Sequence, residues 1–130
     1  MTSEKPLEPF AVDDVRVVPS LIDKVLRVTL SGNVDMRDPG EVFNGFWKDV
    51  DERAAGLGLE RVEVDLRSVG FMNSSGILTL VRWVMRLIPG ARAVRYKVLF
   101  LYDPNVTWQR TNVPVLSRLA PETVSLEGSG

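Results

Sequence analysis

The sequence predicts a single α/β domain, with a mixed sheet of four to five strands, helices mainly on one face, and the element order β-β-α-β-α-β-α-(β). Apolar and polar residues alternate in short segments, such as residues 26–30, 62–66 and 96–100, and this alternation is typical of strands with one face in solvent. Longer segments between them carry apolar residues at helical spacing. With 130 residues, 45% of them hydrophobic, the chain suits one compact domain with a core.

The first elements are predicted to form a β-hairpin. Residues 15–18 and 25–30 are the two strands, and the short turn between them contains Pro19, Ser20 and Asp23.

A helix is predicted to start at Asp38, which can cap it, with Pro39 at the first helical position and Glu41 completing a capping box. Gly56 and Gly58 are expected to end it. Its apolar stripe, which we assign to core packing, comprises Val42, Phe43, Phe46, Trp47, Val50 and Ala54.

The strand at residues 61–66 follows, with Glu63 and Asp65 expected on the solvated face of the sheet. There they can form a solvent-exposed ladder of charges with basic residues on neighbouring strands, namely Arg27, Arg95 and Lys97.

The remaining elements alternate between helix and strand. An apolar helix follows Gly76 and ends at the Pro-Gly pair at residues 89–90. A strand at residues 94–102, a helix at residues 112–119 and a short edge strand at residues 124–126 complete the chain. Right-handed β-α-β crossovers make the central strands parallel, and the first hairpin strand runs opposite to them.

The sequence also predicts the boundaries of the domain and its location. Residues 1–11 and 128–130 are expected to be flexible, and residues 12–127 to form the domain. No apolar run reaches the length of a membrane span, and the start of the chain lacks the pattern of a signal peptide. We therefore expect a cytoplasmic protein that does not bind membranes.

Composition excludes several kinds of chemistry. The chain contains neither cysteine nor histidine, so it has no thiol nucleophile, no Ser-His-Asp triad and no cysteine or histidine metal site. Its net charge is −1 and no basic stripe stands out, which argues against nucleic acid as the main partner. We expect a protein partner, no enzymatic activity, no metal and no cofactor.

The most informative segment is the junction at Asn73, Ser74 and Ser75, where a strand is followed directly by a helix. The first N–H groups of a helix lack partners and its dipole is positive there, so a side-chain oxygen or an attached phosphate is stabilised. Asn73 or Ser74 could simply cap the helix, or a serine could accept a phosphate. Residues 33–35 end the preceding strand and are expected to lie beside this junction.

These residues resemble the STAS family, the anti-sigma-factor antagonists and related regulators. Residues 30–35 are similar to the family's Gly-x-Leu/Val-Asp loop, and residues 64–76 are similar to the strand that leads into its Asp-Ser-Ser-Gly motif. The order of elements agrees over residues 15–126.

The resemblance implies partner switching, in which the unmodified domain binds a regulator, a serine kinase phosphorylates the motif serine and a phosphatase restores it. By position Ser74 is then the phosphoacceptor, with Asp35, Asn73, Ser75 and Gly76 around it on the partner-binding surface. The implied partners are an anti-sigma factor, a serine kinase or a sensor kinase, and a serine phosphatase for reversal.

The chain departs from the family at two places. Asn73 stands where the family has an aspartate, and Trp108, Gln109 and Arg110 precede the predicted last helix, where the family has a plainer loop. These departures favour a divergent branch of bacterial regulators. Trp108 is a candidate anchor for a partner, because tryptophan is enriched in binding hot spots, and packing against the last helix is its alternative role.

Three hypotheses follow. The first is a protein-binding module controlled by phosphorylation of Ser74. The second is a constitutive scaffolding domain within a larger complex, in which the serines only cap. The third is a sensor that binds a small anion at the helix terminus.

Overall fold

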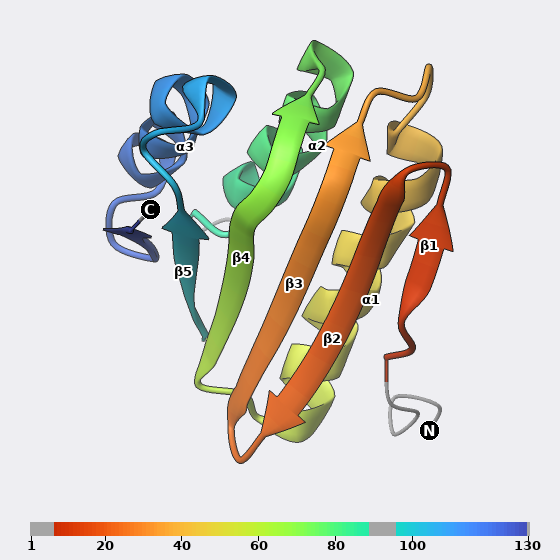
Figure 1. Cartoon of the computed structure of the whole chain (residues 1–130). Helices are drawn as coiled ribbons and strands as arrows, with labels where there is room; N and C mark the ends of the chain where they lie inside the picture. The colour runs from red at the N-terminus through yellow and green to blue at the C-terminus, as the bar shows by residue number, and fades with distance from the viewer. Residues whose placement is uncertain (1–6, 89–95, 130) are drawn as a thin grey trace.

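The computed structural model describes residues 7–88 and 96–129, which form one six-stranded mixed sheet and three helices (Figure 1). The strands are β1 (Phe10–Val12), β2 (Val15–Ile22), β3 (Val25–Val34), β4 (Arg61–Met72), β5 (Lys97–Tyr102) and β6 (Val124–Gly128). The helices are α1 (Gly40–Leu57), α2 (Ser74–Met85) and α3 (Thr107–Leu119). The predicted α/β class and element order are confirmed, with β1 as the strand that the sequence analysis did not predict.

The strands lie in the sheet in the same order as in the sequence. β1, β2 and β3 are antiparallel neighbours, whereas β3, β4, β5 and β6 are parallel. Each parallel connection passes through one helix and advances by one strand in the same direction. Crossovers of a single hand then place every helix on the same face, and all three lie behind the sheet in Figure 1.

Both ends of the ordered domain extend beyond the predicted limits. Phe10 and Ala11, expected to be flexible, belong to β1, and the Phe10 ring packs 5.4 Å from that of Phe46 on α1. At the other end β6 continues to Gly128, and the Ser129 N–H donates to the Tyr102 carbonyl. A three-residue strand is too short for its alternation to be recognised in the sequence.

The hairpin turn lies later than predicted. β2 continues through Pro19 and Ser20 to Ile22, and the chain reverses at Asp23, whose φ is +56°. Proline is tolerated within this strand because β1 pairs only with residues 15–17, so that β2 is the edge of the sheet at Pro19.

Helix α1 starts without the predicted capping box. It begins at Gly40, and its N-cap residue, Pro39, makes no side-chain capping hydrogen bond. The Glu41 N–H instead donates to the main-chain carbonyl of Asp38 over 3.2 Å. The predicted end is confirmed, because Gly58 adopts a left-handed conformation and its N–H bonds to the Ala54 carbonyl.

The core lies between the sheet and the helices. Trp47 of α1 stacks on Trp83 of α2 with ring centroids 4.2 Å apart, and Trp83 meets Phe100 of β5 edge to face. Phe46 packs against Trp47. The assignment of Phe46 and Trp47 to the core is confirmed, since both are buried.

Strand β4 is longer than the pattern at residues 61–66 suggested, because it contains two irregularities in its pairing with β3. The register passes from Thr29↔Asp65 to Ser31↔Ser68, and from Gly32↔Val69 to Asn33↔Phe71. At each step β4 has one residue more than β3, as in a β-bulge. The buried residues of this half are therefore Leu66, Val69 and Met72, spaced by three rather than two.

Helix α3 starts at Thr107 rather than at residue 112, and its first turn is fixed to the far half of β4. Pairing of β4 with β5 stops at Asp65↔Leu101. Beyond that point the Trp108 indole N–H donates to the Val69 carbonyl, and the Gln109 amide donates to the carbonyls of Leu66 and Val69. These side chains satisfy backbone groups that would otherwise be buried without a partner.

The carboxylate of Asp51 joins α1 to α2. It is 9% exposed and accepts hydrogen bonds from the Trp83 indole N–H, the Tyr96 hydroxyl and the Arg86 guanidinium. Burial, together with the charge of Asp51, raises the pKa of Tyr96, so its hydroxyl keeps its proton and donates it. The cluster lies at the end of α2 remote from Ser74.

We predict that Asp51→Ala lowers the free energy of unfolding by about 3 kcal/mol, because it leaves the buried Trp83 indole N–H and the buried Tyr96 hydroxyl without an acceptor. Urea denaturation measures this change. Asp49→Ala, at an exposed position of the same helix, is the control and should stay within about 0.5 kcal/mol of the wild type. Equal effects of the two substitutions would contradict a structural role for the cluster.

Candidate functional site at the start of α2

Asn73 connects the end of β4, the loop after β3 and the first turn of α2. Its side-chain oxygen accepts from the Gly76 N–H at 2.8 Å, and its side-chain nitrogen donates to the Met36 carbonyl at 2.9 Å. Its main-chain N–H donates to the Val34 carbonyl at 2.9 Å. Asn73 is therefore the N-cap of α2, and it brings the two predicted loops side by side as expected.

Gly76 lies where the helix comes closest to the sheet. A Cβ at this position would lie 2.8 Å from side-chain carbons of Met72 and Val34, which leaves no room for one. Gly76 is buried. Its expected place on the partner-binding surface is therefore wrong, and its role is to let α2 start directly above the ends of β3 and β4.

Ser74 and Ser75 are both exposed in the first turn of α2. Since Asn73 caps the helix, capping does not require either serine. Within the described part of the chain, neither hydroxyl makes a hydrogen bond to another group. Both hydroxyls are thus available at the positive end of a helix dipole.

The loop that carries Asp35 is held in place by Gly32 and Asn33. Gly32 has φ +96°, and a Cβ there would lie 1.8 Å from the Asp14 carbonyl oxygen, so only glycine fits. The Asn33 side chain donates to the Asp14 carboxylate at 2.9 Å. Asp35 follows Val34 and is exposed, as a partner-binding residue must be.

Two exposed apolar residues lie within four positions of Ser74 along the chain, and neither was predicted from the sequence as a site residue. Phe71, near the end of β4, is 49% exposed, and Leu78, one turn after Ser74 on α2, is 43% exposed. We call Asp35, Phe71, Ser74, Ser75 and Leu78 the Ser74 surface. Phe71 could not be assigned from the sequence because the second register shift in β4 decides which way it points.

Trp108 does not belong to this surface. It is 8% exposed, and its indole N–H is bonded to the Val69 carbonyl at 2.7 Å. The expectation that it anchors a partner is therefore wrong, and packing, the alternative role, is the observed one.

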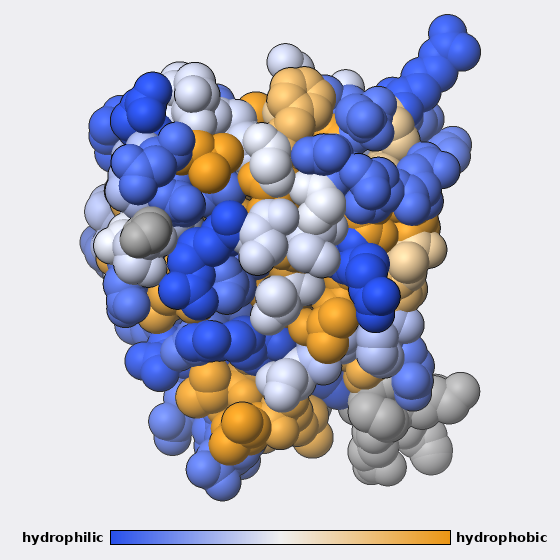
Figure 2. Space-filling model, in the orientation of Figure 1, coloured by the Kyte–Doolittle hydropathy of each residue, from blue (hydrophilic) through white to orange (hydrophobic). Residues whose placement is uncertain are grey.

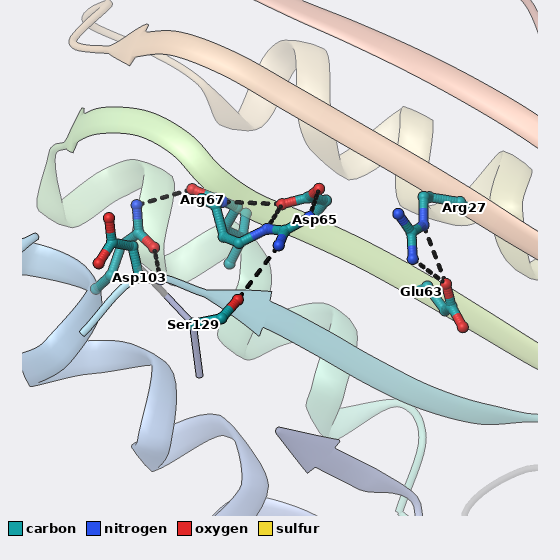
Figure 3. Close-up of polar contacts among 8 residues, drawn as sticks. Arg27, Glu63, Asp65, Arg67, Asp103 and Ser129 are labelled. Carbon is teal, nitrogen blue, oxygen red and sulfur yellow. Dashed lines mark hydrogen bonds and ion pairs between the residues drawn. The ribbon is translucent and has the colours of Figure 1, made fainter. Parts of the chain in front are cut away.

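The open face of the sheet carries ion pairs that are less solvated than expected (Figure 3). Glu63 is 7% exposed beneath Arg27 and Arg61, with nitrogen–oxygen distances of 2.8 and 2.7 Å. Asp65 pairs with Arg67 of its own strand, and the hydrogen bonds from that guanidinium lower the pKa of Asp65. The predicted pairing of Glu63 with Arg27 is confirmed, whereas a fully solvated ladder is not.

Residues 7–88 and 96–129 contain no cluster of three acidic residues placed to hold a metal ion. None of the helices in those residues is both long enough and apolar enough to cross a membrane.

No protein-family model matches the chain, and no curated protein matches it. Among solved structures, it is similar to the crystal structure of an anti-sigma factor antagonist from Mycobacterium paratuberculosis. The TM-score is 0.62 and the sequence identity 17%, over 88% of each chain. At this identity the likeness concerns the fold, and it agrees with the resemblance noted in the sequence. The chain is a single α/β domain with a STAS-like fold.

Proposed function

We propose that this chain is a protein-binding module whose docking is controlled by phosphorylation of Ser74. The observation that carries the proposal is the exposed, unbonded Ser74 hydroxyl at the first position of α2, next to an asparagine that already caps the helix. A phosphate on this oxygen would lie at the positive end of the helix, which favours an anion.

The Ser74 surface has the composition of a docking site. Phe71 and Leu78 supply exposed apolar area, while Asp35 and the two serines supply polar groups around it. A partner that covers Phe71 and Leu78 removes water from the hydroxyls between them. Protein binding is therefore a better match to this surface than catalysis.

A phosphate on Ser74 would weaken such docking. It adds about −1.5 to −2 charges at neutral pH, close to the exposed carboxylate of Asp35. A partner that is complementary to the unmodified surface would then meet repulsion and the cost of burying a dianion. Because the helix end itself tolerates the phosphate, the switch acts on the interface and leaves the fold intact.

The proposed pathway is bacterial partner switching in the cytoplasm. The solved structure with the similar fold is described as an anti-sigma factor antagonist, which suggests an anti-sigma factor as the partner here. A serine kinase or a sensor kinase is an alternative partner, and reversal requires a serine phosphatase. The module itself would need neither a metal nor a cofactor and would catalyse no reaction.

The first prediction separates capping from modification. Asn73→Ala should lower the free energy of unfolding by about 1 kcal/mol or more, because it removes the cap of α2. Ser74→Ala should stay within about 0.5 kcal/mol of the wild type. Urea denaturation of both variants measures this difference. If Ser74→Ala were as destabilising as Asn73→Ala, the serine would be part of the cap, and this result would support the scaffolding hypothesis.

The second prediction concerns the phosphoacceptor. Protein purified from its native host, or treated with the cognate serine kinase, should carry one phosphate by intact mass, and peptide mass spectrometry should locate it on Ser74. Ser74→Ala should abolish the modification, whereas Ser75→Ala, its matched neighbour, should retain it. Equal phosphate uptake by Ser74→Ala and wild-type protein would refute the assignment.

The third prediction concerns the partner. In pull-downs from native lysate, Ser74→Glu should reduce recovery of the main interacting protein about tenfold, which corresponds to about 1.4 kcal/mol of added repulsion. Ser74→Ala should retain that protein. Ser125→Glu, which places the same charge at an exposed position of β6, is the control and should also retain it. Retention by all three variants would indicate a constitutive scaffold instead.

A further inference from the structure

A cavity lies at the end of the sheet opposite to the Ser74 surface. Its volume is about 250 Å³, and residues of β2, β3 and the last turns of α1 line it. The β2–β3 hairpin and the end of α1 lie at the lower end of Figure 1. The residues that matter for its chemistry are Leu7, Leu21, Leu26, Arg53, Leu57 and Leu59. Its wall is therefore made mostly of leucine side chains, with one guanidinium among them.

One nitrogen of that guanidinium has no hydrogen-bond partner among the residues that the structure describes. The Nη1 atom of Arg53 is buried, and within the described part of the chain it makes no hydrogen bond. Asp49, one turn earlier on the same helix, lines an adjoining hollow together with Arg53 and Glu8. No ion pair joins Arg53 to either carboxylate in residues 7–88 and 96–129. Because this nitrogen is shielded from water, an anionic group bound there would supply the acceptor that it lacks.

The surroundings of the cavity favour an anion that carries an apolar chain. The ammonium group of Lys24 donates to the Leu57 carbonyl at 3.0 Å and adds a second positive charge near the cavity. Leu21, which lines the cavity, is 49% exposed, its neighbour Ile22 is 69% exposed, and the lower end of the open face forms an apolar patch in Figure 2. An aliphatic chain entering from this side would stay in contact with apolar side chains along its length.

We propose that this cavity binds a small carboxylate with a short aliphatic chain, whose carboxylate pairs with Arg53 and whose chain contacts the leucines. Octanoate is the probe that represents this class. The site is separate from the Ser74 surface and uses none of its residues, so the proposal is independent of the proposed phosphorylation switch.

Isothermal titration calorimetry of the full chain tests the proposal. Octanoate should bind at least tenfold more tightly than acetate, which has no chain to bury, and than octanol or octylamine, which cannot pair with the guanidinium. Arg53→Met should weaken octanoate binding about tenfold. Arg118→Met, at an exposed position in the last turn of α3, is the matched control and should bind octanoate like the wild type.

Several outcomes would overturn the proposal. An absence of octanoate binding would refute the site itself. Octanoate affinity no higher than that of octanol and octylamine would refute the role of the charge. Equal affinity of Arg53→Met and Arg118→Met would place the ligand elsewhere. If Arg53→Met fails to fold, as circular dichroism would reveal, the ligand series on wild-type protein decides alone. Binding to phosphatidylglycerol vesicles without binding to free octanoate would also contradict it, because the proposed ligand is free in solution.

Discussion

Three hydrogen bonds of Asn73 hold the candidate site together. One side chain caps α2 and holds the Met36 carbonyl, and the main-chain N–H of the same residue holds the Val34 carbonyl. The end of β4, the loop after β3 and the start of α2 are thereby fixed to one another. Because Asn73 caps the helix, neither serine is needed as the cap. Ser74 and Ser75 are exposed, and their hydroxyls make no hydrogen bond within residues 7–88 and 96–129. An aspartate here could cap the helix but could not also donate to a carbonyl.

The rest of the fold supports that junction from two sides. On the sheet side, the two register shifts give β4 two more residues than the stretch of β3 with which it pairs. As a result, the side chains of Val69 and Met72 are buried in the core. On the α3 side, Trp108 and Gln109 donate to the carbonyls of Leu66 and Val69, where β5 no longer pairs with β4. These two side chains take the place of the missing strand pairing, so the role of the Trp-Gln pair is structural.

The two ends of the domain carry different chemistry. The end at Asn73 exposes hydroxyls, a carboxylate and apolar side chains. The other end holds a leucine-lined cavity with a buried cationic atom of Arg53. Helix α1 and strand β3 run the full distance between them (Figure 1). Two separate sites can therefore coexist on one small sheet without competing for the same residues.

Patterns among neighbouring residues were enough to predict the order of the elements, the packing of Phe46 and Trp47 in the core, and the strand-to-helix junction at Asn73 and Ser74. These features depend on local periodicity and on helix-terminus chemistry, both of which neighbouring residues in the chain encode. Alternation also indicated the pairing of Glu63 with Arg27, although not its burial.

Contacts between distant parts of the chain set the length and register of β4 and form the strand at Phe10 to Val12. They also bury Trp108 and leave Phe71 exposed. Trp108 is buried because β4 offers it a free carbonyl, and Phe71 is exposed because a register shift turns it outward. Neither the burial of Trp108 nor the exposure of Phe71 can be predicted from neighbouring residues, because each depends on a strand far away in the sequence. Exposure at a binding surface is set by such long-range pairing, which no short window of residues contains.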